Sequence, residues 1–83
     1  MNFDNRTTEL IALGASVAAN CHPCIQHHKA KAVEAGLTPE EIRAAMEVGR
    51  TVRKGAAASM DKLVASLNEE STAVSMAPSC ACG

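Results

Sequence analysis

Residues 36–42 read GLTPEEI, and this stretch carries the clearest structural signal in the chain. Gly36 fits the left-handed position that commonly ends a helix. Thr38 fits the N-cap of a following helix, with Pro39 at its first position and Glu41 completing a capping box. The stretch therefore predicts that one helix ends here and that another begins after a short turn.

Two shorter helices are predicted on the N-terminal side of this turn. The first runs from about Thr7 to Asn20, with Thr7 or Asp4 as its cap, and its apolar positions recur at helical spacing: Leu10, Leu13, Gly14, Val17 and Ala18. Pro23 fits the first turn of the second helix, where a missing N–H costs nothing. That second helix is expected to run to about Ala35.

The helix that follows the turn is predicted to be long. Its apolar positions trace one stripe over many turns: Ile42, Met46, Gly49, Val52, Ala56, Met60, Leu63 and Leu67. Met46 and Met60 lie at helical spacing and are expected in the core. Gly49 and Gly55 each weaken a helix interior by up to about 1 kcal/mol relative to Ala. They indicate a kink, a break near Gly55 or a close helix crossing.

Length and composition limit the fold. The 83 residues allow one domain at most, no strand pattern occurs, and Phe3 is the only aromatic residue. A helical core of Leu, Ile, Val, Met and Ala is small at this length, so we expect self-association through an apolar helix face. The helical domain is expected to cover residues 1–67, followed at 68–83 by a flexible tail with a Cys-x-Cys.

Charge and hydropathy limit the partners. The net charge is −1 with mixed signs, and the chain has neither a basic stripe nor the aromatic residues that stack on nucleic-acid bases. No apolar run approaches the roughly 20 residues that a bilayer span needs. The first residues lack the pattern of a signal peptide, so a cytoplasmic protein is expected. In that reducing compartment, four Cys residues are more often reactive or metal-binding than structural.

The candidate functional residues are Glu9, Cys21, Cys24 and His28, in the pattern Glu-x11-Cys-x2-Cys-x3-His. Residues three or four apart share a helix face, so the two thiols can approach each other and His28 lies one turn from Cys24. The helix N-terminus, the thiol pair and the His28 base each favour a reactive thiolate. Glu9 lies on the apolar stripe of the first helix, so it is expected to point inward, where a carboxylate needs a partner.

Other interpretations stay open on spacing alone. The two cysteines could be small buried hydrophobes, and Glu9 could be a solvated acid at a helix N-terminus. Two Cys and a His are also ordinary zinc ligands. The tail thiols Cys80 and Cys82 could complete a metal or metalloid site, or pass electrons to the upstream pair.

The remaining polar residues are expected at the surface. His22 and His27 are predicted to be exposed. A group of basic residues on the long helix is predicted to form a solvated face that could attract an anionic partner: Arg43, Arg50, Arg53 and Lys54.

The four-residue pattern, followed by a helix that opens with Thr-Pro-Glu-Glu-Ile, resembles the alkylhydroperoxidase D-like branch of the carboxymuconolactone decarboxylase superfamily. The resemblance covers roughly residues 7–67, and it implies an all-α fold of helical hairpins that assembles as a homo-oligomer. It also implies that Cys24 attacks a hydroperoxide and that Cys21 resolves the product as a disulfide. His28 and Glu9 would then serve a proton relay.

The expected function is therefore a thiol-disulfide oxidoreductase with antioxidant, hydroperoxide-reducing activity of the peroxiredoxin type. Its partners would be a hydroperoxide or disulfide substrate and an external dithiol reductant, and no cofactor is expected. Pro23 stands where the well-studied peroxidases of the family have a further histidine, so dithiol exchange is the firmer part of this expectation.

Two other functions are weighed against this one. The main alternative is a metal- or metalloid-binding protein that uses the same cysteines and His28. The second is an inactive oligomeric scaffold. Lactone decarboxylation, which names the superfamily, gives a Cys-x-x-Cys pair no evident role.

Overall fold

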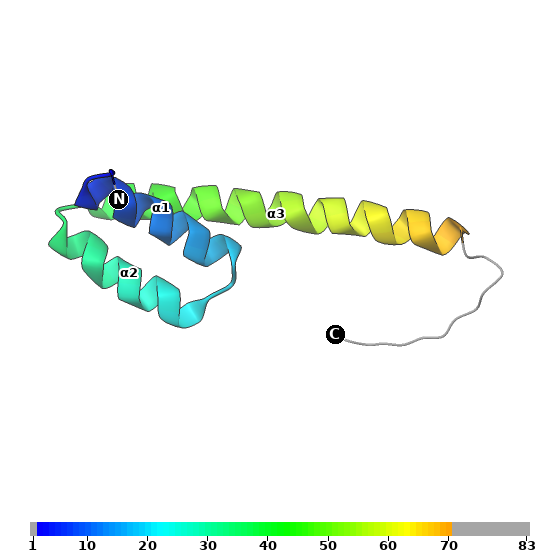
Figure 1. The fold of residues 1–83 in the computed structure, drawn as a ribbon, viewed down its shortest axis with the longest axis horizontal. Coiled ribbons are helices and arrows are strands. Elements are labelled where there is room, and N and C mark those ends of the chain that lie inside the picture. Colours follow the sequence, from blue (N-terminus) through cyan, green and yellow to red (C-terminus); the bar gives the residue numbers. More distant parts are fainter. Residues whose placement is uncertain (1, 71–83) are drawn as a thin grey trace.

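The computed structural model describes residues 2–70 and contains three helices in that range (Figure 1). They are α1 (Asn5–Ala18), α2 (His22–Glu34) and α3 (Pro39–Glu70). The described part of the chain has no strand, so the predicted all-α fold of helical hairpins is confirmed. No helix within it is both long enough and apolar enough to cross a membrane.

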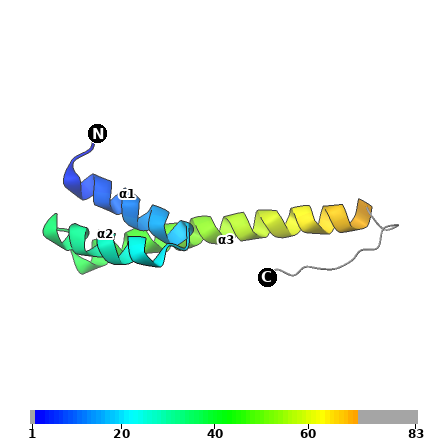
Figure 2. The same ribbon diagram turned by 60° about the horizontal axis from the view of Figure 1, so that its bottom comes forward.

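Helix α1 packs against both other helices and holds the fold together. It lies along the first half of α3, while α2 runs back beside it in the opposite direction (Figures 1 and 2). The buried core is correspondingly small, with Leu10, Ile25 and Met46 packed against five buried residues: Leu13, Ala32, Leu37, Ile42 and Ala45. The second half of α3 extends beyond this core (Figure 2).

The first helix begins and ends two residues earlier than the sequence predicts. Asp4 is the N-cap, because its Oδ1 accepts a hydrogen bond of 2.8 Å from the backbone N–H of Thr7. This bond from Thr7 holds the pKa of the Asp4 carboxyl below its ordinary value. At the other end, Asn20 adopts a left-handed conformation with φ of 56°, which the helix cannot include.

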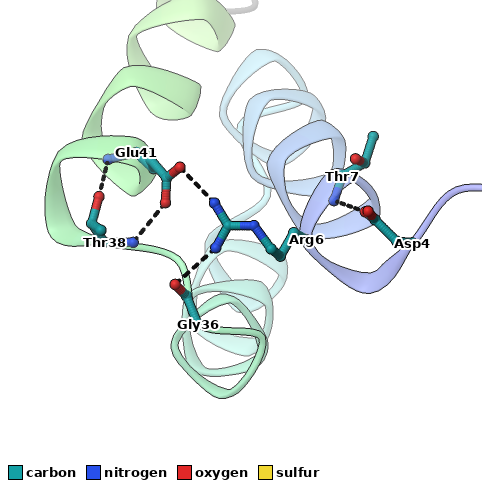
Figure 3. Close-up of polar contacts among 6 residues, drawn as sticks. All are labelled: Asp4, Arg6, Thr7, Gly36, Thr38 and Glu41. Carbon is teal, nitrogen blue, oxygen red and sulfur yellow. Dashed lines mark hydrogen bonds and ion pairs between the residues drawn. The ribbon is translucent and has the colours of Figure 1, made fainter.

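The turn between α2 and α3 has the predicted local structure. Gly36 has a φ of 87°, and the N–H of Leu37 bonds back to Ala32 O at 3.0 Å. The Thr38 N–H donates to Glu41 Oε1 at 2.9 Å, and the Glu41 N–H donates to Thr38 Oγ1 at 3.1 Å (Figure 3). The capping box is therefore confirmed.

Arg6 ties this turn to the start of α1, a connection that no local pattern in the sequence indicates. Its Nη1 donates to Gly36 O at 2.8 Å, and its Nη2 donates to Glu41 Oε2 at 2.6 Å (Figure 3). The pKa of Glu41 lies below its ordinary value because of the Thr38 N–H and, less strongly, the Arg6 charge. One guanidinium thus joins α1 to the end of α2 and to the start of α3.

Helices α1 and α3 cross at a pair of glycines. A Cβ built on Gly49 would collide with the carbonyl oxygen of Gly14 and would lie 2.8 Å from the Cβ of Val17. Gly49 therefore marks a close helix crossing, one of the three meanings its position allowed. Gly55 has open space around it, and α3 runs through it without a break.

The apolar stripe of α3 is covered only as far as Gly49. Met46 packs against the core as predicted, but Met60 is 58% exposed and the prediction that it lies in the core is wrong. The physical reason is the length of α3, because α1 and α2 cover only the half that contains Gly49 (Figure 1). The helix also continues past Leu67 to Glu70, so the first residues of the predicted tail are helical. Residues 71–83 lie outside the described residues.

The glycine crossing predicts opposite effects for the same substitution at two positions. Gly49→Ala should destabilise the fold by about 1–3 kcal/mol, because the added methyl group has no space beside Gly14. Gly55→Ala should stabilise it by up to about 1 kcal/mol through helix propensity. Urea unfolding at one protein concentration, followed by far-ultraviolet circular dichroism, measures both. Equal effects at the two positions would contradict the crossing.

Candidate redox site

The two cysteines lie at the connection between α1 and α2. The backbone N–H of Cys21 donates a hydrogen bond of 3.0 Å to Ser16 O, which connects the turn to the last residues of α1. Cys21 is the N-cap of α2 in an extended conformation, and Pro23 lies in the first helical turn as predicted. The Cys21 and Cys24 Cα atoms are 5.2 Å apart, and the two residues are joined by a disulfide. The spacing of three residues therefore brings both sulfurs together.

The two cysteines differ in their access to solvent-filled space. Both are half-buried. Cys21 lines a hollow of about 280 Å³ beside the α1–α2 turn, together with residues of α1, α2 and α3. Cys24 is not among the residues that line it. A molecule that enters this hollow therefore meets the Cys21 side of the disulfide.

Glu9 and His28 form the second part of the site. Glu9 points inward as predicted and is 9% exposed, and its Oε1 lies 2.8 Å from Nδ1 of His28. A carboxylate can only accept a hydrogen bond, so the Nδ1–H of His28 donates. In the neutral ring this leaves Nε2 as the proton acceptor. His28 follows Cys24 by one helical turn, so the two residues share one face of α2.

The Glu9 carboxylate also has a route to solvent. Glu9 lines a polar hollow of about 200 Å³ that has Lys31, Glu34 and Ala35 of α2 on its other side. The carboxylate thus lies between the His28 ring and an open polar space. Such an arrangement can exchange a proton with water on one side and with the imidazole on the other.

Arg53 is the residue of this region that the sequence analysis placed wrongly. Its Nη1 donates to Asn20 Oδ1 at 2.9 Å and to Val17 O at 3.4 Å, so it contacts the end of α1 rather than forming part of a solvated face. The signal that could have found it is Gly49, four residues earlier on α3. A residue one turn beyond a close crossing must lie against the crossing helix.

The other surface predictions hold within the described residues. Arg50 pairs with Glu47 at 2.8 Å on the exposed side of α3, and Lys54 is exposed. His22 and His27 are also exposed.

The described part of the chain has no cluster of metal-ligating side chains that would support the zinc interpretation. No group of three or more His, Cys, Asp or Glu residues in residues 2–70 is arranged to hold a metal ion. Cys80 and Cys82 lie outside the described residues, so this search does not include them.

The described residues thus combine an all-helical fold with a half-buried Cys-x-x-Cys disulfide and a part-buried Glu–His pair. The carboxymuconolactone decarboxylase family has a sequence model that matches residues 2–66. The chain belongs to this family, which includes the alkylhydroperoxidase D-like proteins. Comparison with curated proteins and with solved structures yields no significant match.

The Glu9–His28 hydrogen bond predicts the tautomer of one histidine. At a pH where the ring is neutral, His28 should carry its proton on Nδ1, and Glu9→Leu should change the tautomer ratio at least about tenfold. Long-range proton–nitrogen correlation NMR reads the tautomer directly. His22 is the internal control, because it is exposed and lies six residues from His28, and it should not respond. A wild-type His28 protonated on Nε2 would contradict the assignment.

Proposed function

We propose that the protein is a thiol-disulfide oxidoreductase that reduces hydroperoxides. The observation that carries the proposal is the joined Cys21–Cys24 pair on the same hairpin as a part-buried Glu9–His28 pair. Membership of a family that includes alkylhydroperoxidase D-like proteins supports it. A thiol donor, either one dithiol or two monothiols, must regenerate the enzyme, and the proposed location is therefore a reducing compartment, the cytoplasm.

The proposed cycle begins with the reduced enzyme. The Cys24 thiolate attacks the distal oxygen of the hydroperoxide, the O–O bond breaks, and the leaving alkoxide takes a proton from His28 and departs as an alcohol. The product is a sulfenic acid on Cys24. The Cys21 thiol then attacks the Cys24 sulfur, releases water and forms the disulfide. An external dithiol, or two molecules of a monothiol, returns two electrons and two protons, which restores both thiols.

Each of the four residues has one role in this cycle. His28 is the base that forms the Cys24 thiolate, because it follows Cys24 by one turn and its Nε2 is the free acceptor. Glu9 stabilises the imidazolium and exchanges its proton with water through the polar hollow. Cys21 resolves the sulfenic acid and, on the hollow beside the turn, meets the reductant.

The assignment of the two sulfurs predicts different behaviour of two serine variants. Cys24→Ser should lower dithiol-dependent hydroperoxide consumption to the uncatalysed background and should leave no sulfenic acid to trap. Cys21→Ser should still give a trapped sulfenic acid on residue 24, because only the resolving thiol is lost. Mass spectrometry after dimedone treatment measures the trap.

Both variants are made with Cys80 and Cys82 replaced by Ser, so that the tail thiols cannot resolve or react. Trapping on residue 21 in Cys24→Ser would reverse the assignment of the two sulfurs. Equal hydroperoxide consumption by the parent and by Cys24→Ser would remove the peroxidase function.

We also propose that the chain forms a homo-oligomer through α3. An apolar groove of about 670 Å³ lies between α1 and α3, and Ile11, Val48 and Val52 are exposed along it. The same stripe of α3 continues into its second half with exposed Met60 and Leu63.

A second copy of the chain is the occupant that this surface favours. Because α3 is unbroken, its second half cannot fold back onto the groove of its own chain. Antiparallel pairing of two α3 helices about a twofold axis lays the second half of each copy over the groove of the other. The apolar area buried in this way would supplement a core of five buried hydrophobic residues.

The proposed interface predicts that one valine matters for assembly and another does not. Val52→Asp should raise the dissociation constant of the oligomer at least about tenfold, because it places a charge in the apolar groove. Val33→Asp is the matched control, since Val33 on α2 is 60% exposed and lies outside the groove. Light scattering after size exclusion measures the mass. A monomeric parent protein would contradict the proposal.

A further inference from the structure

The hollow beside the α1–α2 turn has a cationic side chain and one end of the disulfide in its lining. Its volume is about 280 Å³, and its lining includes Cys21, Asn20, Gln26 and Arg53. Among the described residues that line it, Arg53 is the one permanent cation, His22 is the other basic side chain, and none is a carboxylate. The space next to the Cys21 end of the disulfide therefore carries positive charge.

The guanidinium of Arg53 is held in place with donors to spare. Both of its hydrogen bonds within the described residues use Nη1, which contacts Asn20 Oδ1 and the carbonyl oxygen of Val17. Nε and Nη2 form no hydrogen bond there. The other arginines of α3 differ, since Arg50 and Arg43 lie within ion-pair distance of glutamates one turn away. Arg53 is thus fixed by neutral oxygens and keeps its positive charge uncompensated at the hollow.

We propose that Arg53 binds the anionic group of a small thiol that reduces the Cys21–Cys24 disulfide. The inference rests on the proposed function and names the chemical class of its reductant: a low-molecular-weight thiol with a carboxylate or sulfonate near its sulfur. A guanidinium suits anionic groups with several oxygens because its fixed fork of N–H donors can bond two of those oxygens at once. The volume of the hollow, about 280 Å³, lies below the roughly 300–1,000 Å³ of pockets for drug-sized ligands. A hollow of this volume suits a low-molecular-weight thiol.

The reduction assigns a different role to each sulfur. The reductant thiolate attacks Cys21 Sγ, the Cys21–Cys24 bond breaks, and Cys24 leaves as the thiolate. A second reductant thiolate attacks the sulfur of the first, which releases a small disulfide and the Cys21 thiolate. Two thiols are oxidised and one protein disulfide is reduced. The anion site therefore lies at the end of the bond that the reductant attacks.

The test compares two thiols of similar size that differ in charge. The oxidised protein is treated with 2-mercaptoethanesulfonate or with neutral 2-mercaptoethanol. The reaction is stopped by alkylation, and the peptide that contains Cys21 and Cys24 is quantified by mass spectrometry. With rates normalised to thiolate concentration, the parent protein should favour the anionic thiol. Arg53→Gln should lower that preference about fivefold, the upper end for one exposed ion pair, and leave the rate with 2-mercaptoethanol unchanged.

Two further variants separate binding from a structural role. Arg50→Gln removes a cation one turn away and should change neither rate. Arg53→Lys keeps the charge and should restore most of the preference, which a merely structural role would not require. If circular dichroism shows that Arg53→Gln has lost helicity, the role of Arg53 is tested instead by the salt dependence of the two reduction rates in the parent protein. Added salt should then slow 2-mercaptoethanesulfonate more than 2-mercaptoethanol, because the attacking thiolate of the sulfonate carries the additional negative charge.

The outcomes distinguish this inference from the proposed function. No charge preference in the parent, or an unchanged preference in Arg53→Gln, overturns the role of Arg53 while leaving the redox function in place. An equal loss of rate with both thiols in Arg53→Gln also overturns it, because Arg53 would then act on Cys21 and not on the reductant. Failure of both thiols to reduce the parent disulfide would instead remove the redox function itself.

Discussion

The close crossing of α1 and α3 at Gly14 and Gly49 is the constraint on which the rest of the structure depends. With no side chain on either glycine, the two helix backbones lie in contact, and Leu13 beside the crossing becomes fully buried. Helix α1 also packs against α2, so its position sets where both hairpins lie. One turn after Gly49, the same approach brings Arg53 to the end of α1. A single side chain at this crossing would therefore move the core and the redox site together.

Two polar connections fix the α1–α2 hairpin at its ends, and the Glu9–His28 bond depends on both. At one end, Arg6 bonds the turn that follows α2, and at the other the Cys21 N–H bonds Ser16 O. Between these points the hairpin places Glu9 and His28 within hydrogen-bond distance, although 19 positions separate them in the chain. The site is thus positioned by one side-chain contact and one backbone contact at the helix ends.

Helix α3 divides the molecule into a packed half and an uncovered half. At about 1.5 Å per residue its 32 residues span roughly 48 Å, more than twice the length of α1. The first half buries Ile42 and Ala45 in the core, whereas Met60 and Leu63 stay exposed on the second half. The apolar stripe itself is continuous, so burial along α3 is decided by which neighbours cover it.

The sequence by itself determined three local features: the capping box at Thr38, the left-handed Gly36 and the proximity of Cys21 and Cys24. Each depends on residues a few positions apart, and the inward direction of Glu9 follows from helical periodicity. Only the tertiary structure decided that Gly49 crosses a helix while Gly55 does not, that Met60 is exposed, and that Arg53 contacts the end of α1. These features depend on which distant segment lies opposite, and a repeating stripe contains no information about where its covering helix stops.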